Sequence, residues 1–213
     1  MIVNQQTHAY LVEYIKNNPT DADALWRYAR ACHDMATVTA DKEKKKAYVY
    51  EAHEVAKQAL ELAPTNFACH KWYAITLSSI GDYEGTKSTI ENAFPVRKHF
   101  EKALELSPGD ATTSHLLGLW HYTIADMSWY VRKIAATIFA SPPESTYEAA
   151  RDCFAQAEAS EPGFYLKNAL MLGKAYAAIG DSAQAKIWFE KAKNMPVGNA
   201  DDKEAQAEAA KLC

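Results

Sequence analysis

Residues 173–196, which read GKAYAAIGDSAQAKIWFEKAKNMP, carry the clearest structural pattern in the chain. A small residue and an aromatic one, Gly173 and Tyr176, come first, and Gly180 and Asp181 form a turn. Then come Ala185, the aromatic Phe189, Ala192 and finally Pro196. Spacings of three and four residues place side chains on one face of an α-helix. A proline just past the last of them cannot continue the helix. The stretch therefore predicts two helices joined by a tight turn.

The second half of this unit recurs upstream, which indicates a repeat. The recurring positions are Ala52, Ala56, Ala59 and Pro64; Val96, Phe100, Ala103 and Pro108; and Ala150, Phe154, Ala157 and Pro162. The first helices centre on small residues that allow close approach: Ala29, Ala74, Gly118 and Gly173. This order matches the tetratricopeptide repeat. Because apolar residues recur at three and four rather than two, we predict an all-α solenoid of antiparallel helix pairs.

The units differ in length. In the first two, the second helix begins later than in the unit around Gly173, and in the third it begins later still. We therefore predict lengthened or inserted helices in these three units, and nine or ten helices in all. The chain is expected to form one domain with an N-terminal helix (1–20), four repeat units (21–64, 65–108, 109–162 and 163–196) and a polar capping helix (197–213).

Composition bounds the class of protein. The chain has 213 residues, 48% of them hydrophobic, and a formal net charge of −4, as in ordinary globular domains. This charge is too small to attract nucleic acid over the whole surface. No stretch approaches the roughly 18 apolar residues that a transmembrane helix needs. The four cysteines, Cys32, Cys69, Cys153 and Cys213, show no metal-ligand spacing, so we expect reduced thiols, no metal site and a cytoplasmic location.

Signatures of catalysis are missing from the sequence. It contains no GxxxxGK[ST], GxGxxG, HExxH or GxSxG motif. The two glycines of Gly81-Asp-Tyr-Glu-Gly85 fall where the repeat requires a turn. We therefore predict a protein that binds a partner and is not an enzyme, with no cofactor.

A solenoid of this kind offers a concave face lined by the first helix of each pair. Counting along those helices, away from the packing face, predicts a groove lined by Trp26, Arg30, His33, Lys71, Ile75, Ser78, His115, Leu119, Tyr122, Lys167, Leu170 and Lys174. The set holds bases and apolar groups but no carboxylate. It would suit an extended acidic peptide, or an anionic lipid whose tails lie on the apolar groups. The alternative is that these are ordinary solvated or half-buried helix positions.

Two other segments are candidates for contact with a partner. The basic run Lys42, Lys44, Lys45 and Lys46 begins a long second helix and either touches an acidic surface or is simply solvated. The insertion in the third unit carries Trp129, Arg132, Lys133 and Phe139. Because so much apolar surface is costly to leave in water, the insertion either packs over neighbouring helices and closes part of the groove or contacts a partner or lipid.

Several motifs connect the chain to a known family. They are Lys71-Trp-Tyr-Ala, Gly81-Asp-Tyr-Glu-Gly, His99-Phe-Glu-Lys-Ala-Leu-Glu-Leu, Trp129-Tyr, Arg132-Lys-Ile-Ala, Phe139-Ala-Ser-Pro-Pro and Leu172-Gly-Lys-Ala-Tyr. Over roughly residues 67–192 the chain resembles the regulator of microtubule dynamics family. The segment 1–60 resembles it less distinctly.

The resemblance implies a microtubule-associated protein of the cytosol, found at spindle microtubules and spindle poles and needed for chromosome segregation. Some members of the family instead carry an N-terminal membrane anchor and bind phospholipid at contacts between endoplasmic reticulum and mitochondria. Because this chain starts almost at its first helix, we expect the microtubule branch. The leading hypothesis is an adaptor whose basic residues meet tubulin or a microtubule-bound partner. A phospholipid-binding or transfer module and a general peptide-binding scaffold stay open as alternatives.

Overall fold

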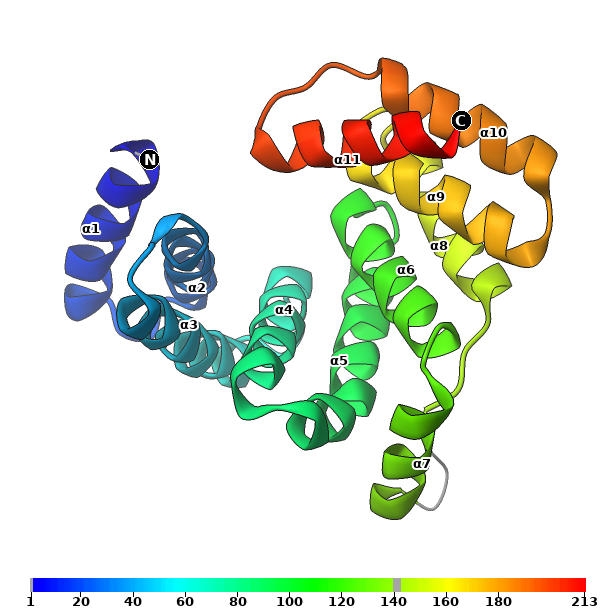
Figure 1. Ribbon diagram of the computed structural model, residues 1–213. Coiled ribbons are helices and arrows are strands. Elements are labelled where there is room, and N and C mark those ends of the chain that lie inside the picture. The colour runs from blue at the N-terminus through cyan, green and yellow to red at the C-terminus, as the bar shows by residue number, and fades with distance from the viewer. Residues whose placement is uncertain (1, 140–142) are drawn as a thin grey trace. The chain divides into compact units, whose positions relative to one another are not determined.

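The computed structural model describes residues 2–139 and 143–213, and within these ranges it contains eleven α-helices and no β-strand. The helices are α1 (Ile2–Asn17), α2 (Ala22–Val38), α3 (Lys42–Leu62), α4 (Phe67–Glu84), α5 (Thr86–Leu106), α6 (Ala111–Ala125), α7 (Trp129–Ile138), α8 (Tyr147–Ser160), α9 (Leu166–Ile179), α10 (Ser182–Asn194) and α11 (Ala200–Leu212), all shown in Figure 1. The predicted all-α class is confirmed, with one helix more than the expected nine or ten.

Helices pack in consecutive pairs. The pairs are α2 with α3, α4 with α5, α6 with α8 and α9 with α10. Two of these pairs stack on the pair before them: α4 contacts both α2 and α3, and α9 contacts both α6 and α8. This stacking of pairs is the tetratricopeptide arrangement that the sequence predicts.

The unequal unit lengths have two origins. In the first two units the helices are long, with 17 and 21 residues in α2 and α3 and 18 and 21 residues in α4 and α5. The last pair has only 14 and 13 residues. In the third unit the extra chain forms a separate helix, α7, between the paired helices α6 and α8. The prediction of lengthened or inserted helices is therefore confirmed.

Every position predicted to pack in the second helices is buried. These residues are Ala52, Ala56, Ala59, Val96, Phe100, Ala103, Ala150, Phe154, Ala157, Ala185, Phe189 and Ala192. The small residues at the centres of the first helices, Ala29, Ala74, Gly118 and Gly173, are buried as well. The repeat register inferred from the sequence is thus the packing register of the fold.

Prolines mark the ends of the second helices. The four helices end at Leu62, Leu106, Ser160 and Asn194, and in each case the proline stands two residues further on. A proline has no backbone N–H to continue the helical ladder, and it restricts the residue before it to extended conformations. It therefore ends one unit and directs the chain into the next.

The chain divides into two compact units, Met1–Pro108 with α1 to α5 and Gly109–Cys213 with α6 to α11. The assignment of the whole chain to a single domain stays a prediction. None of the helices in the described ranges combines the length and the apolar composition needed to cross a bilayer.

Candidate functional site

The second unit carries an open pocket of about 640 Å³. Five helices or their ends contribute to it, and the lining residues are Tyr122, Asp126, Tyr147, Lys174, Ala177, Ala178, Ser182, Ala185, Lys186, Phe189, Glu208, Leu212 and Cys213. Two of them, Tyr122 and Lys174, belong to the groove predicted from the sequence. Their binding role stays a prediction, but the structure does place both at one cavity.

Two tyrosines form one polar corner of the pocket. The Tyr147 hydroxyl, at the start of α8, donates a hydrogen bond of 2.8 Å to Asp126 Oδ1, at the end of α6. This bond raises the pKa of Tyr147. Burial, followed by the charge of Asp126, raises the pKa of Tyr122, whose ring lies 5.3 Å from that of Tyr147. Both phenols are therefore neutral hydrogen-bond donors at physiological pH.

An ion pair joins two helices at another edge of the pocket. Lys174 on α9 pairs with Glu208 on α11, and both side chains are partly open to water. Lys174 and Lys186 are balanced in number by Asp126 and Glu208, while the exposed Ala177 and Ala178 supply apolar surface. This mixture fits a peptide that places an apolar side chain on these alanines and makes polar contacts around them.

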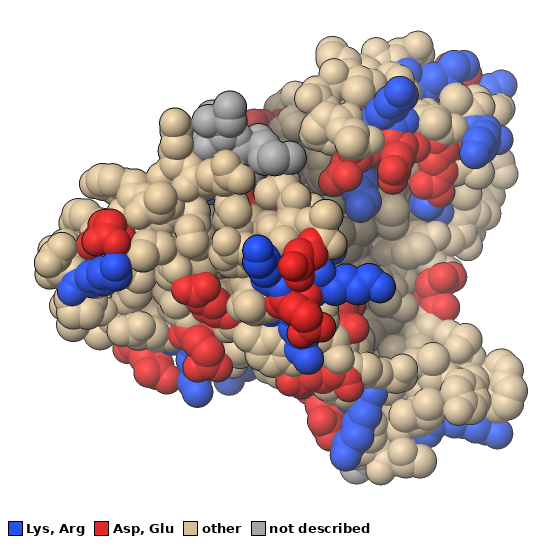
Figure 2. Space-filling model, turned by 60° about the vertical axis from the view of Figure 1, so that its left-hand side comes forward, with Lys and Arg blue, Asp and Glu red and all other residues tan. Residues whose placement is uncertain are grey.

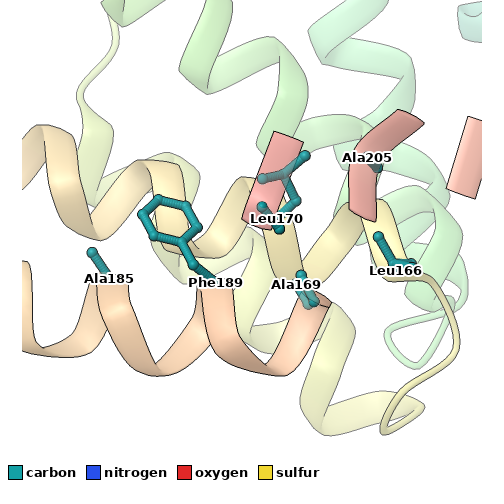
Figure 3. Close-up of a cluster of buried hydrophobic side chains, with 8 residues drawn as sticks. Leu166, Ala169, Leu170, Ala185, Phe189 and Ala205 are labelled. Carbon is teal, nitrogen blue, oxygen red and sulfur yellow. The ribbon is translucent and has the colours of Figure 1, made fainter. Parts of the chain in front are cut away.

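Helix α11 covers a face of α9 that was predicted to line the groove. Leu166, Ala169 and Leu170 of α9 pack with Ala205 and Ala209 of α11 in one buried cluster, which also includes residues of α10 (Figure 3). Leu170 is only 2% exposed and belongs to the core. The prediction of Leu170 as a groove residue is therefore wrong, because the capping helix lies on it.

His115 does not line a groove either. It is 3% exposed, and its Nδ1 lies 3.0 Å from Asn168 Oδ1, while Asn168 Nδ2 donates to the Phe154 carbonyl oxygen at 3.0 Å. Burial lowers the pKa of His115 to about 4, so the imidazole is neutral and donates from Nδ1. The residue joins α6, α8 and α9 through hydrogen bonds in the core. The prediction of His115 as a partner-binding residue is wrong.

The other predicted groove residues of the second unit have mixed environments. Leu119 is half-buried and packs against the cluster around Phe154, whereas Lys167 is exposed at the start of α9. Of the predicted residues in this unit, only Tyr122 and Lys174 meet at the pocket.

In the first unit the predicted groove residues have local partners. The Trp26 Nε1 group donates to Asp23 Oδ1 at 2.9 Å, and Arg30 lies 3.7 Å from Asp34 Oδ2. Lys71 Nζ lies 5.1 Å from the centre of the Phe67 ring, and Ile75 is half-buried. The carboxylates of Asp23 and Asp34 thus lie beside this set, although neither belongs to it. A groove that continues through both units stays a prediction.

The predicted basic patch, defined here as Lys42, Lys44, Lys45 and Lys46, lies on the protein surface. All four side chains are exposed on the first turns of α3. Asp41 caps this helix by accepting hydrogen bonds from the backbone N–H groups of Glu43 and Lys44 at 3.0 and 3.1 Å. Cations at a helix N-terminus oppose the helix dipole, so the basic patch does not help this helix to form. Its contact with an acidic surface stays a prediction.

The insertion exposes two of its aromatic residues to water. Trp129 and Tyr130 at the start of α7 are 69% and 62% exposed, and Ala135 is the one buried side chain of the helix. Lys133 Nζ lies 4.7 Å from the centre of the Trp129 ring, and Arg132 is exposed. Phe139 is half-buried, while Ser141 and Pro142 lie outside the described residues. The prediction that the insertion packs its apolar groups over neighbouring helices is wrong for Trp129 and Tyr130.

Comparison with known proteins identifies the family. A family model described as regulator of microtubule dynamics protein 1-3 matches residues 2–213. The chain belongs to the regulator of microtubule dynamics family. The match also includes the N-terminal segment up to position 60, where the quoted motifs of the family are less distinct.

Several curated relatives carry the family name. Regulator of microtubule dynamics protein 1 of Pongo abelii is 49% identical over 209 residues, which is 98% of this chain and 66% of the relative. The Homo sapiens protein 1 is 52% identical over 188 residues, 88% of this chain and 60% of the relative. Regulator of microtubule dynamics protein 3 of Xenopus laevis is 35% identical, covering 85% of this chain and 39% of the relative. This chain spans 60% to 68% of the length of the protein 1 relatives that it matches.

Solved structures support the fold. The tetratricopeptide protein TTC0263 of Thermus thermophilus matches with a TM-score of 0.68 at 16% identity, covering 98% of this chain and 91% of that one. YrrB, described as a tetratricopeptide protein with an unusual peptide-binding site, matches with a TM-score of 0.55 at 15% identity, covering 98% and 84%. At such low identity the likeness concerns the fold alone.

The sequence did not predict most of the residues that line the pocket of the second unit. Asp126, Tyr147 and Glu208 lie at helix ends or on the capping helix, outside the first-helix positions that the repeat pattern selects. No signal in the spacing of the repeat indicates that the last helix turns back onto α9.

Proposed function

We propose that this chain is a non-enzymatic adaptor that binds microtubules, or a partner bound to them, in spindle organisation and chromosome segregation. The observation that carries the proposal is the match of residues 2–213 to a family whose members are named regulators of microtubule dynamics. The paired helices suit this role, because helical repeats present extended surfaces for other proteins. The proposal places the protein in the cytoplasm, on the cytoskeleton, at the spindle and its poles.

Electrostatics favours a local contact. The net charge is −4, and on the face in Figure 2 the acidic and basic side chains lie interspersed. The overall electric field of this protein would therefore not attract an acidic tubulin surface. The basic patch would attract it, because its four lysines are exposed together on one helix.

The pocket of the second unit offers a separate place for a peptide. A bound segment would set an apolar side chain against the exposed Ala177 and Ala178 and accept hydrogen bonds from Tyr122 or Lys174. This contact would let one unit hold a partner while the basic patch on the other meets an acidic surface. The same pocket would serve the alternative function, a general peptide-binding scaffold.

Co-sedimentation with polymerised tubulin tests the main proposal. The full chain should pellet with microtubules, and the variant with glutamine at Lys42, Lys44, Lys45 and Lys46 should pellet less. The matched control carries glutamine at four exposed lysines elsewhere, Lys16, Lys57, Lys87 and Lys98, so that both variants lose the same charge. Equal loss in both variants would argue against the patch, and no pelleting of the parent chain would argue against direct binding.

A phospholipid surface is a second candidate, and α7 is the observation that favours it. Its ten residues include the exposed Trp129 and Tyr130, the basic Arg132 and Lys133, and no acidic residue. Aromatic rings beside cations suit the interface of an anionic membrane. The pocket of the second unit is open and carries charged groups, so it does not supply the enclosed apolar slot that lipid transfer needs.

Vesicle flotation separates this candidate from the first. Binding to vesicles of phosphatidylcholine with phosphatidylserine should fall when Trp129 and Tyr130 are both replaced by alanine. The matched control is Tyr10→Ala, since Tyr10 is an equally exposed aromatic residue on α1. Absence of flotation, or the same loss in the control, would rule out a lipid role for α7.

A further inference from the structure

Three side chains that are far apart in the sequence converge in the first unit. His8 lies on α1, Cys32 on α2 and Glu51 on α3, and one nitrogen, sulfur or oxygen atom from each lies within 4.8 Å of the other two. Imidazole, thiolate and carboxylate are the three kinds of side chain that bind zinc in proteins. The sequence predicts no metal site, because no two of these residues stand at a recognisable metal-ligand spacing along the chain.

The imidazole of His8 has a ring nitrogen that lacks a hydrogen-bond partner. Its Nε2 is buried and has no hydrogen-bond partner among the described residues. A buried polar atom without a partner destabilises a fold, so native structures rarely leave one unless it has another role, such as binding an ion. The ring itself is held in place, with its centre 5.2 Å from that of Tyr28 and 5.4 Å from that of Tyr48.

The carboxylate of Glu51 is oriented by a second residue. The Tyr28 hydroxyl donates a hydrogen bond of 2.5 Å to Glu51 Oε1. A carboxylate has further lone pairs on both oxygens, so it can accept this bond and still bind a cation. Partners of this kind commonly fix the ligands of a metal site.

The cluster spans the boundary between core and solvent. Cys32 is fully buried, His8 is half-buried and Glu51 is exposed. The carboxylate therefore lies on the solvent side of the cluster, and the thiol lies on its buried side.

We propose that His8, Cys32 and Glu51 form a zinc site with three protein ligands, and that water supplies the fourth. In a tetrahedral site with bonds of 2.0 to 2.3 Å, neighbouring ligand atoms lie roughly 3.5 Å apart. The three ligand atoms lie within 4.8 Å of one another, so binding would have to draw the His8 and Glu51 side chains slightly closer to Cys32. The mixed nitrogen, sulfur and oxygen set favours zinc over magnesium or calcium, which prefer oxygen alone.

Binding has a defined proton balance. Without metal, burial and then the nearby Glu51 charge raise the pKa of the Cys32 thiol to about 12, so the sulfur carries its proton. Zinc replaces this proton at the sulfur, and one proton leaves to solvent for each ion bound. The bound ion would link α1, α2 and α3, so it should stabilise the first unit against heat.

The experiment uses the full chain, stripped of metal with a chelator and then titrated with zinc chloride. We expect one equivalent to bind and the melting temperature to rise. His8→Ala, Cys32→Ala and Glu51→Gln should each weaken binding by more than tenfold. Tyr28→Phe should weaken it by about 10- to 100-fold, as the loss of orienting partners does elsewhere.

Two matched variants control for general effects. Cys69→Ala removes another buried thiol of the same unit, and Glu54→Gln removes another exposed carboxylate of the same helix; both should bind zinc as the parent does. A cobalt titration of the parent needs no variant and should show thiolate-to-cobalt charge-transfer absorption. Absence of stoichiometric zinc, absence of that absorption, or equal losses in the control variants would overturn the proposal.

Discussion

The Phe189 ring on α10 occupies the space that a side chain on Gly173 of α9 would need. A Cβ added to Gly173 would lie 2.6 Å from Phe189 Cδ1, closer than real Cβ contacts come. Gly118 of α6 and Phe154 of α8 repeat the relationship at 2.7 Å. Within the second unit, each helix pair is therefore held by an aromatic ring set against a bare backbone position.

The first prediction concerns Gly118, which packs against Phe154. Gly118→Ala should destabilise the chain by about 1 to 3 kcal/mol, because the added methyl group forces the Phe154 ring or the backbone to move. Chemical denaturation measures the change. Gly109→Ala is the control, since a Cβ there meets nothing within 4 Å and should have little effect. An equal effect of both substitutions would mean that the close approach to Phe154 does not decide the outcome.

The second prediction concerns the ring. Phe154 is fully buried, so Phe154→Ala should cost about 3 to 5 kcal/mol through lost transfer energy and the cavity left behind. The double variant with Gly118→Ala should cost less than the sum of the two, because the new methyl group then enters vacated space. Additive losses, or a loss under about 1 kcal/mol for Phe154→Ala, would contradict the packing described here.

The repeat register could be predicted from the sequence because it depends on contacts close in the chain. Ala185, Phe189 and Pro196 follow their first helix within one unit, and the same short-range pattern recurs three times. The irregular units could also be predicted, because extra residues between two packing positions must form longer helices or an insertion.

The surface of the second unit depends on contacts that spacing does not encode. His115 looks like a groove residue when counted along its helix, but Asn168 of a later repeat accepts its hydrogen bond and buries it. Leu170 is likewise covered by α11. The cluster of His8, Cys32 and Glu51 arises in the same way, because three helices must pack before the three atoms meet.

The third prediction is a loss of stability in mild acid. Burial lowers the pKa of His115 to about 4 and, together with the neighbouring His70, lowers that of His99 to about 4, from 6.5. Between these values the unfolded chain binds protons that the folded chain does not, so the free energy of unfolding should fall as the pH falls from about 6.5 to about 4. For His115 alone the loss is about 3 kcal/mol at the lower limit.

Denaturation at several pH values measures this slope. His99 Nδ1 lies 2.8 Å from His70 Nδ1, and His70 Nε2 lies 2.9 Å from the Pro64 carbonyl oxygen, which makes His99 the donor to His70. His99→Asn can keep that donor but cannot titrate, so it should reduce the slope. An unchanged slope in this variant, or greater stability in acid, would show that these pKa values do not govern the pH response.

The fourth prediction concerns the ion pair at the pocket. Glu208→Gln should raise the affinity of the second unit for an acidic peptide, because Lys174 then has no competing carboxylate at that edge. Stability should change by less than about 1 kcal/mol, since the pair is partly exposed. Glu204→Gln, an exposed change on the same helix outside the pocket, is the control. Equal affinity for parent and Glu208→Gln would show that Lys174 takes no part in binding.

The last prediction is how microtubule binding responds to salt. If lysines meet acidic tubulin tails, the attraction is screened over a Debye length of about 8 Å at physiological ionic strength. Binding should therefore weaken steeply from low to moderate salt. Neutralising the basic patch should lower both the affinity and the salt slope, while thermal stability stays nearly unchanged because exposed charges contribute little to folding.

A second set of lysines separates the basic patch from the predicted groove. Neutralising Lys71, Lys167 and Lys174 should have the smaller effect, because Lys174 already pairs with Glu208 and Lys71 lies over Phe67. If this set instead has the larger effect, and removal of the tubulin tails abolishes binding, then the groove holds the tails. If neither set matters and salt has no effect, the attraction is not electrostatic. The exposed Trp129 and Tyr130 then become the contact to test, since they offer apolar surface that salt does not screen.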